Sequence, residues 1–334
     1  MKISASIYSD KDRSLKETIQ DLADHNVDML HVDCNDDISV FEDIRQIRQW
    51  CTLPIDLHII TETPSKYMSL LEEVPVEYVT FQYENLKEPL KIPPAVTAKK
   101  GLAIITPTPV EVFEEYADFD FILIMATIPG QSGGVFDKWN FKKIRTFKKK
   151  YPAKSVHVDG GVNGEVSFIL RNMGVSSAVS GSYLFKAPSV GQALLNLTNR
   201  SIESEFEVED FMVPLEECPV VYLENLGLKP ALEEIERGQL GFSLVLDNDR
   251  KLQGIISNAD VRKGLLQQFD MLPSVSIDKM VNRNPVRIND KNTVIEMLQV
   301  IKRCPFPVMY LPVVDELGFA KGIVTFVNLI KSEI

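Results

Sequence analysis

Three short motifs place a histidine and an aspartate two residues apart, the spacing that puts both side chains on one face of a β-strand. The motifs are His31-Val32-Asp33, Asp56-Leu57-His58 and His157-Val158-Asp159. If the three faces point toward one another, two or three imidazoles and up to three carboxylates converge. A mixed histidine and aspartate set suits a borderline divalent ion such as zinc, iron or manganese.

A divalent metal flanked by two carboxylates supports a defined chemistry. The metal polarises a carbonyl and stabilises the enediolate that forms when the neighbouring carbon loses a proton. One carboxylate removes that proton and the other supplies a proton from the opposite face. A single histidine or aspartate at a strand end is more often structural. A group of carboxylates in an apolar interior, however, is costly without a metal or another partner.

The elements that position these motifs recur along the first 200 residues. Short apolar runs alternate with helical patterns such as 14–25 and 166–174, which is typical of repeated βα units. The eight runs are 2–7, 28–34, 54–60, 77–81, 101–105, 121–127, 155–161 and 177–182. They predict a (β/α)8 TIM barrel, whose chemistry sits at the carboxyl ends of the strands. A doubly wound sheet fits the same periodicity. The stretch 84–100, with three prolines, is the weakest helix prediction.

Glycines cluster after the last three predicted strands. They lie in the loop 129–134, in the pair Gly160-Gly161 and in Gly181-Ser182. Backbone N–H groups in such loops often bind a phosphate in this fold. Each glycine pair alone is more simply a turn. Three in succession favour a phosphorylated substrate.

Beyond residue 200 the pattern changes. The stretch 199–211 is polar and acidic, and we place a linker at 201–208. The segment 244–266 then resembles the segment 311–331, and each predicts a strand, an acidic turn, a second strand and a helix. We therefore expect a barrel over 1–200 and an α+β pair of modules over 209–334, at about 209–268 and 276–334.

Composition excludes several classes of protein. With 45% hydrophobic and 25% charged residues the chain is an ordinary globular protein. Its net charge is −11, and both parts are acidic, so no nucleic acid or membrane partner is expected. No apolar run approaches the ~20 residues of a spanning helix. The absence of a signal-like N-terminus and of paired cysteines indicates a cytoplasmic protein with reduced thiols.

The first 200 residues resemble the ribulose-phosphate 3-epimerase family. The matching segments are 6–9 (Ser-Ile-Tyr-Ser), 30–33, 55–58, Met125 with Pro129-Gly130, 158–162 and Gly181-Ser182. The resemblance implies that His31, Asp33, His58 and Asp159 ligate one divalent metal per barrel, with Asp33 and Asp159 as the acid/base pair. It further implies that the substrate contacts Ser6 and Met125. The phosphate would lie at Gly133, Gly160, Gly161, Gly181 and Ser182.

The chain also departs from the family pattern. The loop that usually covers the site is shortened, since Cys34-Asn35-Asp36-Asp37 runs almost directly into a helix. Asn35 and Ile60 replace methionines of the metal-side cage, and His157 replaces a usual glutamate. The resemblance therefore implies a ketose-phosphate 3-epimerase more strongly than it implies ribulose 5-phosphate as the substrate.

The paired modules resemble a tandem of CBS domains. The matches are clearest in the second module, at 280–286, 311–315 and 322–325. The family's nucleotide signature, Ser/Thr-x-x-Asp, is kept at Ser257 and Asp260. In the second module Thr325 is followed by Asn328, which weakens one of two possible adenosine nucleotide sites. A dimerisation unit without ligand fits the residues nearly as well.

The leading hypothesis is a metal-dependent epimerase of a phosphorylated ketose, regulated by a nucleotide at the CBS pair. The alternative is an inactive barrel that serves as a nucleotide sensor or scaffold. Decarboxylase or aldolase chemistry is not supported, because the Asp-x-Lys-x-x-Asp motif of those enzymes is absent from the sequence. Because both families often assemble, a homo-oligomer is expected.

Overall fold

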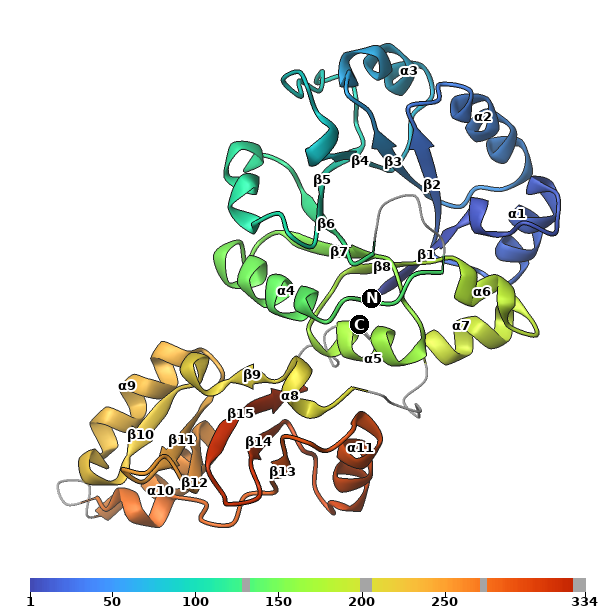
Figure 1. The fold of residues 1–334 in the computed structure, drawn as a ribbon. Coiled ribbons are helices and arrows are strands. Elements are labelled where there is room, and N and C mark those ends of the chain that lie inside the picture. The colour runs from blue at the N-terminus through green and yellow to red at the C-terminus, as the bar shows by residue number, and fades with distance from the viewer. Residues whose placement is uncertain (128–132, 199–205, 271–274, 327–334) are drawn as a thin grey trace. The chain divides into compact units, whose positions relative to one another are not determined.

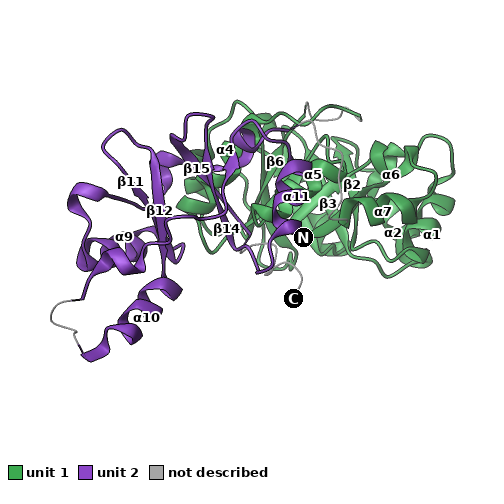
Figure 2. Ribbon diagram, turned by 90° about the horizontal axis from the view of Figure 1, so that it is seen from below, with its two compact units in different colours: residues 1–202, 328–334 green, residues 203–327 purple. Residues whose placement is uncertain are grey.

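The computed structural model describes residues 1–127, 133–198, 206–270 and 275–326 (Figure 1). The chain divides into two compact units, the first built mainly on residues 1–202 and the second on 203–327 (Figure 2). Part of the expected linker, 201–205, lies outside the described residues. The remainder belongs to the second unit, where Glu207 pairs with Thr293.

The first unit is a closed barrel of eight parallel strands, which confirms the predicted TIM barrel. Each strand pairs with the next, and the eighth returns to the first (Figure 1). The strands are β1 (Lys2–Ser6), β2 (Met29–Asn35), β3 (Ile55–Ile60), β4 (Tyr78–Gln82), β5 (Lys99–Ile105), β6 (Phe121–Met125), β7 (Ser155–Asp159) and β8 (Ser177–Ser180). Their residues are mostly buried, as expected for parallel strands covered by helices.

Amphipathic helices surround the barrel. They are α1 (Leu15–Asp24), α2 (Val40–Trp50), α3 (Met68–Glu73), α4 (Trp139–Lys150), α5 (Gly164–Asn172), α6 (Ser182–Lys186) and α7 (Val190–Thr198). Short 3-10 turns are η1 (Ile7–Ser9), η2 (Pro64–Tyr67), η3 (Tyr83–Asn85) and η4 (Val110–Tyr116). The proline-rich stretch after β4 forms only η3. This agrees with its weak helical signal, because proline removes backbone donors.

The second unit begins with α8 (Val208–Phe211), a short helix inside the stretch that sequence periodicity left irregular. Glu207 and Asp210 form its capping box. Three-stranded and four-stranded sheets follow. Their elements are β9 (Val213–Pro214), η5 (Leu215–Glu217), β10 (Val220–Tyr222), η6 (Leu223–Asn225), α9 (Leu228–Gly238), β11 (Phe242–Leu246), β12 (Leu252–Ser257), α10 (Asn258–Gln267), η8 (Ile277–Met280), β13 (Ile288–Asn289), α11 (Val294–Arg303), β14 (Tyr310–Val314) and β15 (Ala320–Thr325).

The two sheets repeat one pattern. β10 and β11 are parallel and β11 and β12 antiparallel, and β13, β14 and β15 pair in the same way. The register matches as well, since Phe242 lies opposite Ser257 and Tyr310 lies opposite Thr325. The predicted duplication is therefore a structural one, and Ser257 and Thr325 occupy equivalent positions.

The two modules share an apolar core. Phe242 and Tyr310 have ring centroids 4.7 Å apart, and Ile255 of β12 is buried in the same cluster as Ile323 of β15. The modules therefore fold as one unit. Within the described residues, no helix is both long enough and apolar enough to cross a membrane.

Candidate metal centre and substrate site

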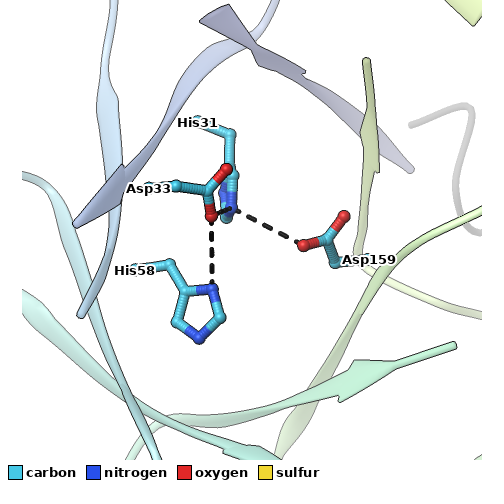
Figure 3. Close-up of side chains that lie close together, drawn as sticks. All are labelled: His31, Asp33, His58 and Asp159. Carbon is cyan, nitrogen blue, oxygen red and sulfur yellow. Dashed lines mark hydrogen bonds and ion pairs between the residues drawn. The ribbon is translucent and has the colours of Figure 1, made fainter. Parts of the chain in front are cut away.

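The four predicted metal ligands converge at the carboxyl ends of three barrel strands. His31 and Asp33 come from β2, His58 from β3 and Asp159 from β7 (Figure 3). Each residue offers a ligand atom within 4.8 Å of the other three. Within the described residues this set of two imidazoles and two carboxylates could hold a metal ion.

Asp56 fixes the orientation of His31. Its Oδ2 lies 2.9 Å from Nδ1 of His31, and because a carboxylate only accepts, Nδ1 is the donor. The other ring nitrogen, Nε2, lies 3.2 Å from Asp33 Oδ1 and 3.7 Å from Asp159 Oδ2. Asp56 thus orients the His31 ring without being one of the four clustered residues. Nε2 of His31 is left facing the carboxylates of Asp33 and Asp159, where a metal ligand is needed.

His58 is oriented from the other side. Its Nε2 lies 3.0 Å from Gln82 Oε1, while its Nδ1 lies 3.5 Å from Asp33 Oδ1. This Nδ1 is buried and has no hydrogen-bond partner. A buried nitrogen without a partner is costly unless something occupies the space before it. The residues present therefore fit a divalent metal.

The two carboxylates experience different environments. Burial disfavours the charged form of Asp33, but His31 and His58 outweigh it and hold the pKa of Asp33 well below its usual range. Burial of Asp159 dominates instead and raises its pKa to about 6. Despite burial, Asp33 and Asp56 raise the pKa of His31 well above its usual value. Two carboxylates with pKa values pushed apart are typical of an acid/base pair.

His157 does not join the cluster. Its ring stacks on Phe121 with centroids 4.1 Å apart, deeper in the barrel than Asp159 of the same strand. Burial lowers the pKa of His157 to about 4. The three motifs allowed up to three imidazoles and three carboxylates to converge. In the structure two imidazoles and two carboxylates do so, and the third carboxylate, Asp56, contacts His31 from outside this group.

Two further predicted residues flank the cluster. Ser6, at the end of β1, pairs in register with His31, and Met125, at the end of β6, pairs with Asp159. The Oγ of Ser6 lies 3.1 Å from Oγ of Ser9. Both residues therefore end their strands at the level of the cluster.

The glycines after β7 and β8 adopt tight conformations. Gly160 and Gly161 have φ values of +110° and +67°. A Cβ on Gly161 would overlap the backbone of Phe136, and one on Gly181 would overlap the Ser9 side chain. These positions require glycine.

Gly133 faces two polar side chains of α6. A Cβ placed on it would lie 3.7 Å from Ser182 Oγ and 4.0 Å from Lys186 Nζ. Residues 129–132 of the same loop lie outside the described residues. Sequence reasoning missed Lys186, although a lysine four residues after Gly181-Ser182 was a usable signal for an anion site.

The two residues that replace the family's cage methionines lie side by side. Asn35 and Ile60 are register partners at the ends of β2 and β3. The following turn is fixed by Asp36, which pairs with Lys66 at 2.5 Å and accepts a hydrogen bond from Thr61. The shortened loop is thus held against β3, leaving Asn35 exposed.

In the second unit, Ser257 caps helix α10. Its Oγ donates to Asp260 Oδ2 at 2.6 Å and accepts from the Asp260 backbone at 3.2 Å. Ser257 and Asp260, both predicted to bind a nucleotide, therefore also have a structural role in capping the helix. Thr325 occupies the equivalent strand end, and Asn328 lies outside the described residues.

Solved structures resemble the C-terminal region. A CBS domain-containing protein from Bacillus anthracis has 23% identity and a TM-score of 0.33, covering 38% of this chain and 92% of that chain. CBSX2 in complex with AMP has 22% identity and a TM-score of 0.33, covering 38% of this chain and 96% of its own.

The barrel matches a family model and curated relatives. The model of the "Ribulose-phosphate 3 epimerase family" matches residues 2–185. The ribulose-phosphate 3-epimerase of Methanocaldococcus jannaschii is 31% identical over 219 residues, which is 61% of this chain and 92% of the relative. The enzyme of Bacillus subtilis is 26% identical over 200 residues, 55% of this chain and 92% of its own. The chain therefore belongs to the ribulose-phosphate 3-epimerase family.

Proposed function

We propose that the chain is a metal-dependent epimerase that inverts C3 of a phosphorylated ketose. One observation carries this proposal: Asp33 and Asp159 enter the same small space from opposite parts of the barrel, β2 and β7, and share it with two oriented imidazoles. Epimerisation at a carbon next to a carbonyl needs an acid and a base on opposite faces of that carbon.

His31 Nε2, Asp33, His58 Nδ1 and Asp159 would hold the ion. A divalent metal supplies Lewis-acid polarisation of the substrate carbonyl and stabilises the enediolate. One aspartate takes the C3 proton as C3–H breaks, and the other gives a proton to the opposite face. Asp56 and Gln82 keep both imidazoles in the tautomers that this arrangement needs.

The phosphate of the substrate would bind where Gly133, Gly160, Gly161, Gly181 and Ser182 lie, with Lys186 as the cation. The Lys186 ammonium, 4.0 Å from a Cβ placed on Gly133, supports this placement. Ser6 and Met125 would contact the sugar. Because Asn35 and Ile60 replace apolar cage residues, the sugar need not be ribulose 5-phosphate.

The test is exchange of the substrate's C3 proton with deuterated solvent. The full chain, loaded with Mn²⁺ or Zn²⁺, is incubated with ribulose 5-phosphate and a panel of other ketose phosphates, and deuterium is followed by NMR. Asp33→Asn and Asp159→Asn should each slow exchange by about 10²-fold to 10⁴-fold, whereas Asp118→Asn, an exposed site, should not. Retained exchange in both site variants contradicts the proposal. A protein that folds but exchanges no substrate with any metal supports the sensor or scaffold alternative.

We further propose that the CBS pair binds an adenosine nucleotide at Ser257 and Asp260 in the first module. Asp260 is only partly buried, which supports this placement. The equivalence of Thr325 with Ser257 supports a second, weaker position. A homo-oligomer and a cytoplasmic location stay predictions.

A further inference from the structure

The two histidines of the candidate metal centre have different partners behind them. Nδ1 of His31 donates directly to a carboxylate, that of Asp56, at 2.9 Å. Nε2 of His58 instead meets an amide, Oε1 of Gln82, at 3.0 Å. A carboxylate only accepts, so Asp56 admits one tautomer of His31, whereas an amide can present either its oxygen or its nitrogen. The tautomer of His58 therefore depends on what holds the Gln82 amide.

The opposite orientation of this amide would disable His58 as a ligand. If Gln82 turned its amide nitrogen toward Nε2, the imidazole proton would move to Nδ1. That nitrogen would then donate to Asp33 Oδ1, which lies 3.5 Å from it (Figure 3). A protonated ring nitrogen has no lone pair for a metal. In the metal-free chain Asp33 thus favours the tautomer that cannot bind the ion, and another contact must oppose it.

Glu84 supplies that contact. Its Oε2 accepts from Nε2 of Gln82 at 2.5 Å, and the carbonyl oxygen of Ala103 is a second, weaker acceptor at 3.4 Å. Turning the amide over would set the Gln82 oxygen against the Glu84 carboxylate, two acceptors without a proton between them. A hydrogen bond to an ionised acceptor is stronger than one between neutral groups. Glu84 therefore selects the end of the amide that faces His58.

The carboxylate of Glu84 is itself fixed on its other oxygen, although the residue lies at an exposed position after β4. Its Oε1 accepts from the backbone N–H of Ile105 at 3.0 Å and from the hydroxyl of Thr108. Both carboxylate oxygens are therefore in use. An acceptor held in this way orients an amide better than a freely rotating side chain does.

Lys143 of α4 holds the turn from which these two donors come. Its Nζ donates to the carbonyl oxygen of Ile105 at 2.6 Å and to that of Thr108 at 2.5 Å. Lys143 is half-buried, and it contacts the same two residues that hold Glu84. A chain of contacts therefore runs from helix α4 through the turn after β5 to Glu84.

We propose that Glu84 is a positioning residue of the metal centre, which keeps the proton of His58 on Nε2 through the Gln82 amide. Lys143 supports this role by holding the turn that fixes Glu84. His58 Nδ1 is thereby kept ready as a ligand before the metal binds. The role presupposes the metal centre of the proposed function. It gives both imidazoles a carboxylate partner, direct for His31 and through one amide for His58.

The test reads the tautomer of His58 in the metal-free, full-length protein, at a pH at which this ring is neutral. Nitrogen chemical shifts distinguish protonated from unprotonated ring nitrogens, and comparison with His58→Gln assigns the signals among the four histidines. The wild type should carry the proton on Nε2. In Glu84→Met, which removes both acceptor oxygens, the proton should move to Nδ1. Titration with Zn²⁺ should then show an affinity about tenfold lower than that of the wild type.

Two further variants make the result specific. Glu115→Met removes the same charge from an exposed position of η4 and should leave the tautomer and the Zn²⁺ affinity unchanged. Thr108→Val removes one hydrogen bond to Glu84 with little change of shape. It should shift the tautomer in the same direction by a smaller amount, and it tests the role even if Glu84→Met does not fold.

The tautomer also separates this proposal from the proposed activity. The positioning role is wrong if His58 keeps its proton on Nε2 in both Glu84→Met and Thr108→Val, because the Ala103 carbonyl would then suffice to orient the amide. It is also wrong if the wild type carries the proton on Nδ1. A tautomer that responds to Glu84→Met in a chain that exchanges no C3 proton supports the positioning role and contradicts the epimerase activity alone.

Discussion

The Gln82 amide oxygen lies 3.0 Å from Nε2 of His58, in the interior of the barrel. The amide nitrogen of Gln82 donates to Glu84 at 2.5 Å, which fixes which end of the amide faces the imidazole. Since an amide oxygen only accepts, His58 Nε2 carries the proton. His58 Nδ1 is then left with its lone pair toward Asp33 and Asp159.

Replacing Gln82 should therefore weaken metal binding without removing a ligand. Gln82→Leu frees the His58 ring to adopt the wrong tautomer, and loss of such a partner costs about 10-fold to 100-fold in metal affinity. Isothermal titration of the metal-free protein with Zn²⁺ measures the change. Gln192→Leu, on the exposed surface of α7, is the matched control. Unchanged affinity in Gln82→Leu would show that His58 is held by packing alone.

Lys186 supplies a second prediction, which concerns substrate binding. Lys186→Met keeps most of the length of the side chain and removes its charge. If the ammonium contacts the substrate phosphate in both ground and transition states, KM should rise about tenfold or more while kcat changes little. Steady-state kinetics with the active ketose phosphate measure both constants. Lys149→Met, on exposed α4, should change neither. An equal fall in kcat at constant KM would instead assign Lys186 to the chemical step.

Much of this architecture could be predicted from the sequence because the signals are local. All eight barrel strands follow from apolar runs, and the His-x-Asp spacing placed the four ligands on inward faces of their strands. The duplication of the second unit follows from two similar segments and is confirmed by their strand register.

The parts that could not be predicted depend on depth and on contacts between distant strands. His157 has the same spacing from Asp159 as His31 from Asp33, yet its ring stacks on Phe121 and does not join the cluster of metal-binding side chains. Gln82 becomes a partner of His58 only through the pairing of β3 with β4.

Gly161 offers a test of packing around the loops proposed to bind the phosphate. It has φ of +67°, and a Cβ would overlap the Phe136 backbone, so Gly161→Ala should destabilise the barrel by about 3 kcal/mol or more. Gly133 has φ of +86° but its nearest atoms lie at 3.7 Å, so Gly133→Ala should cost only about 1–2 kcal/mol.

Urea unfolding followed by tryptophan fluorescence measures this difference. Both tryptophans, Trp50 and Trp139, belong to helices of the barrel, so the signal reports the first unit alone. This matters because two units need not unfold as one. Equal costs for the two variants would mean that the Phe136 segment moves aside readily.

A comparison of variants at Ser257 and Thr293 can distinguish an effect on helix capping from an effect on nucleotide binding. Both cap a helix through the same box, Ser257 with Asp260 on α10 and Thr293 with Glu296 on α11. Each alanine variant should lose about 1 kcal/mol of local stability, visible as faster hydrogen exchange in its own helix. Only Ser257→Ala should also weaken AMP binding, by about tenfold, in calorimetric titration of the full chain. If Thr293→Ala weakens AMP equally, the effect comes from loosening the unit. If neither variant changes a measurable affinity, Ser257 serves as a cap and the nucleotide lies elsewhere.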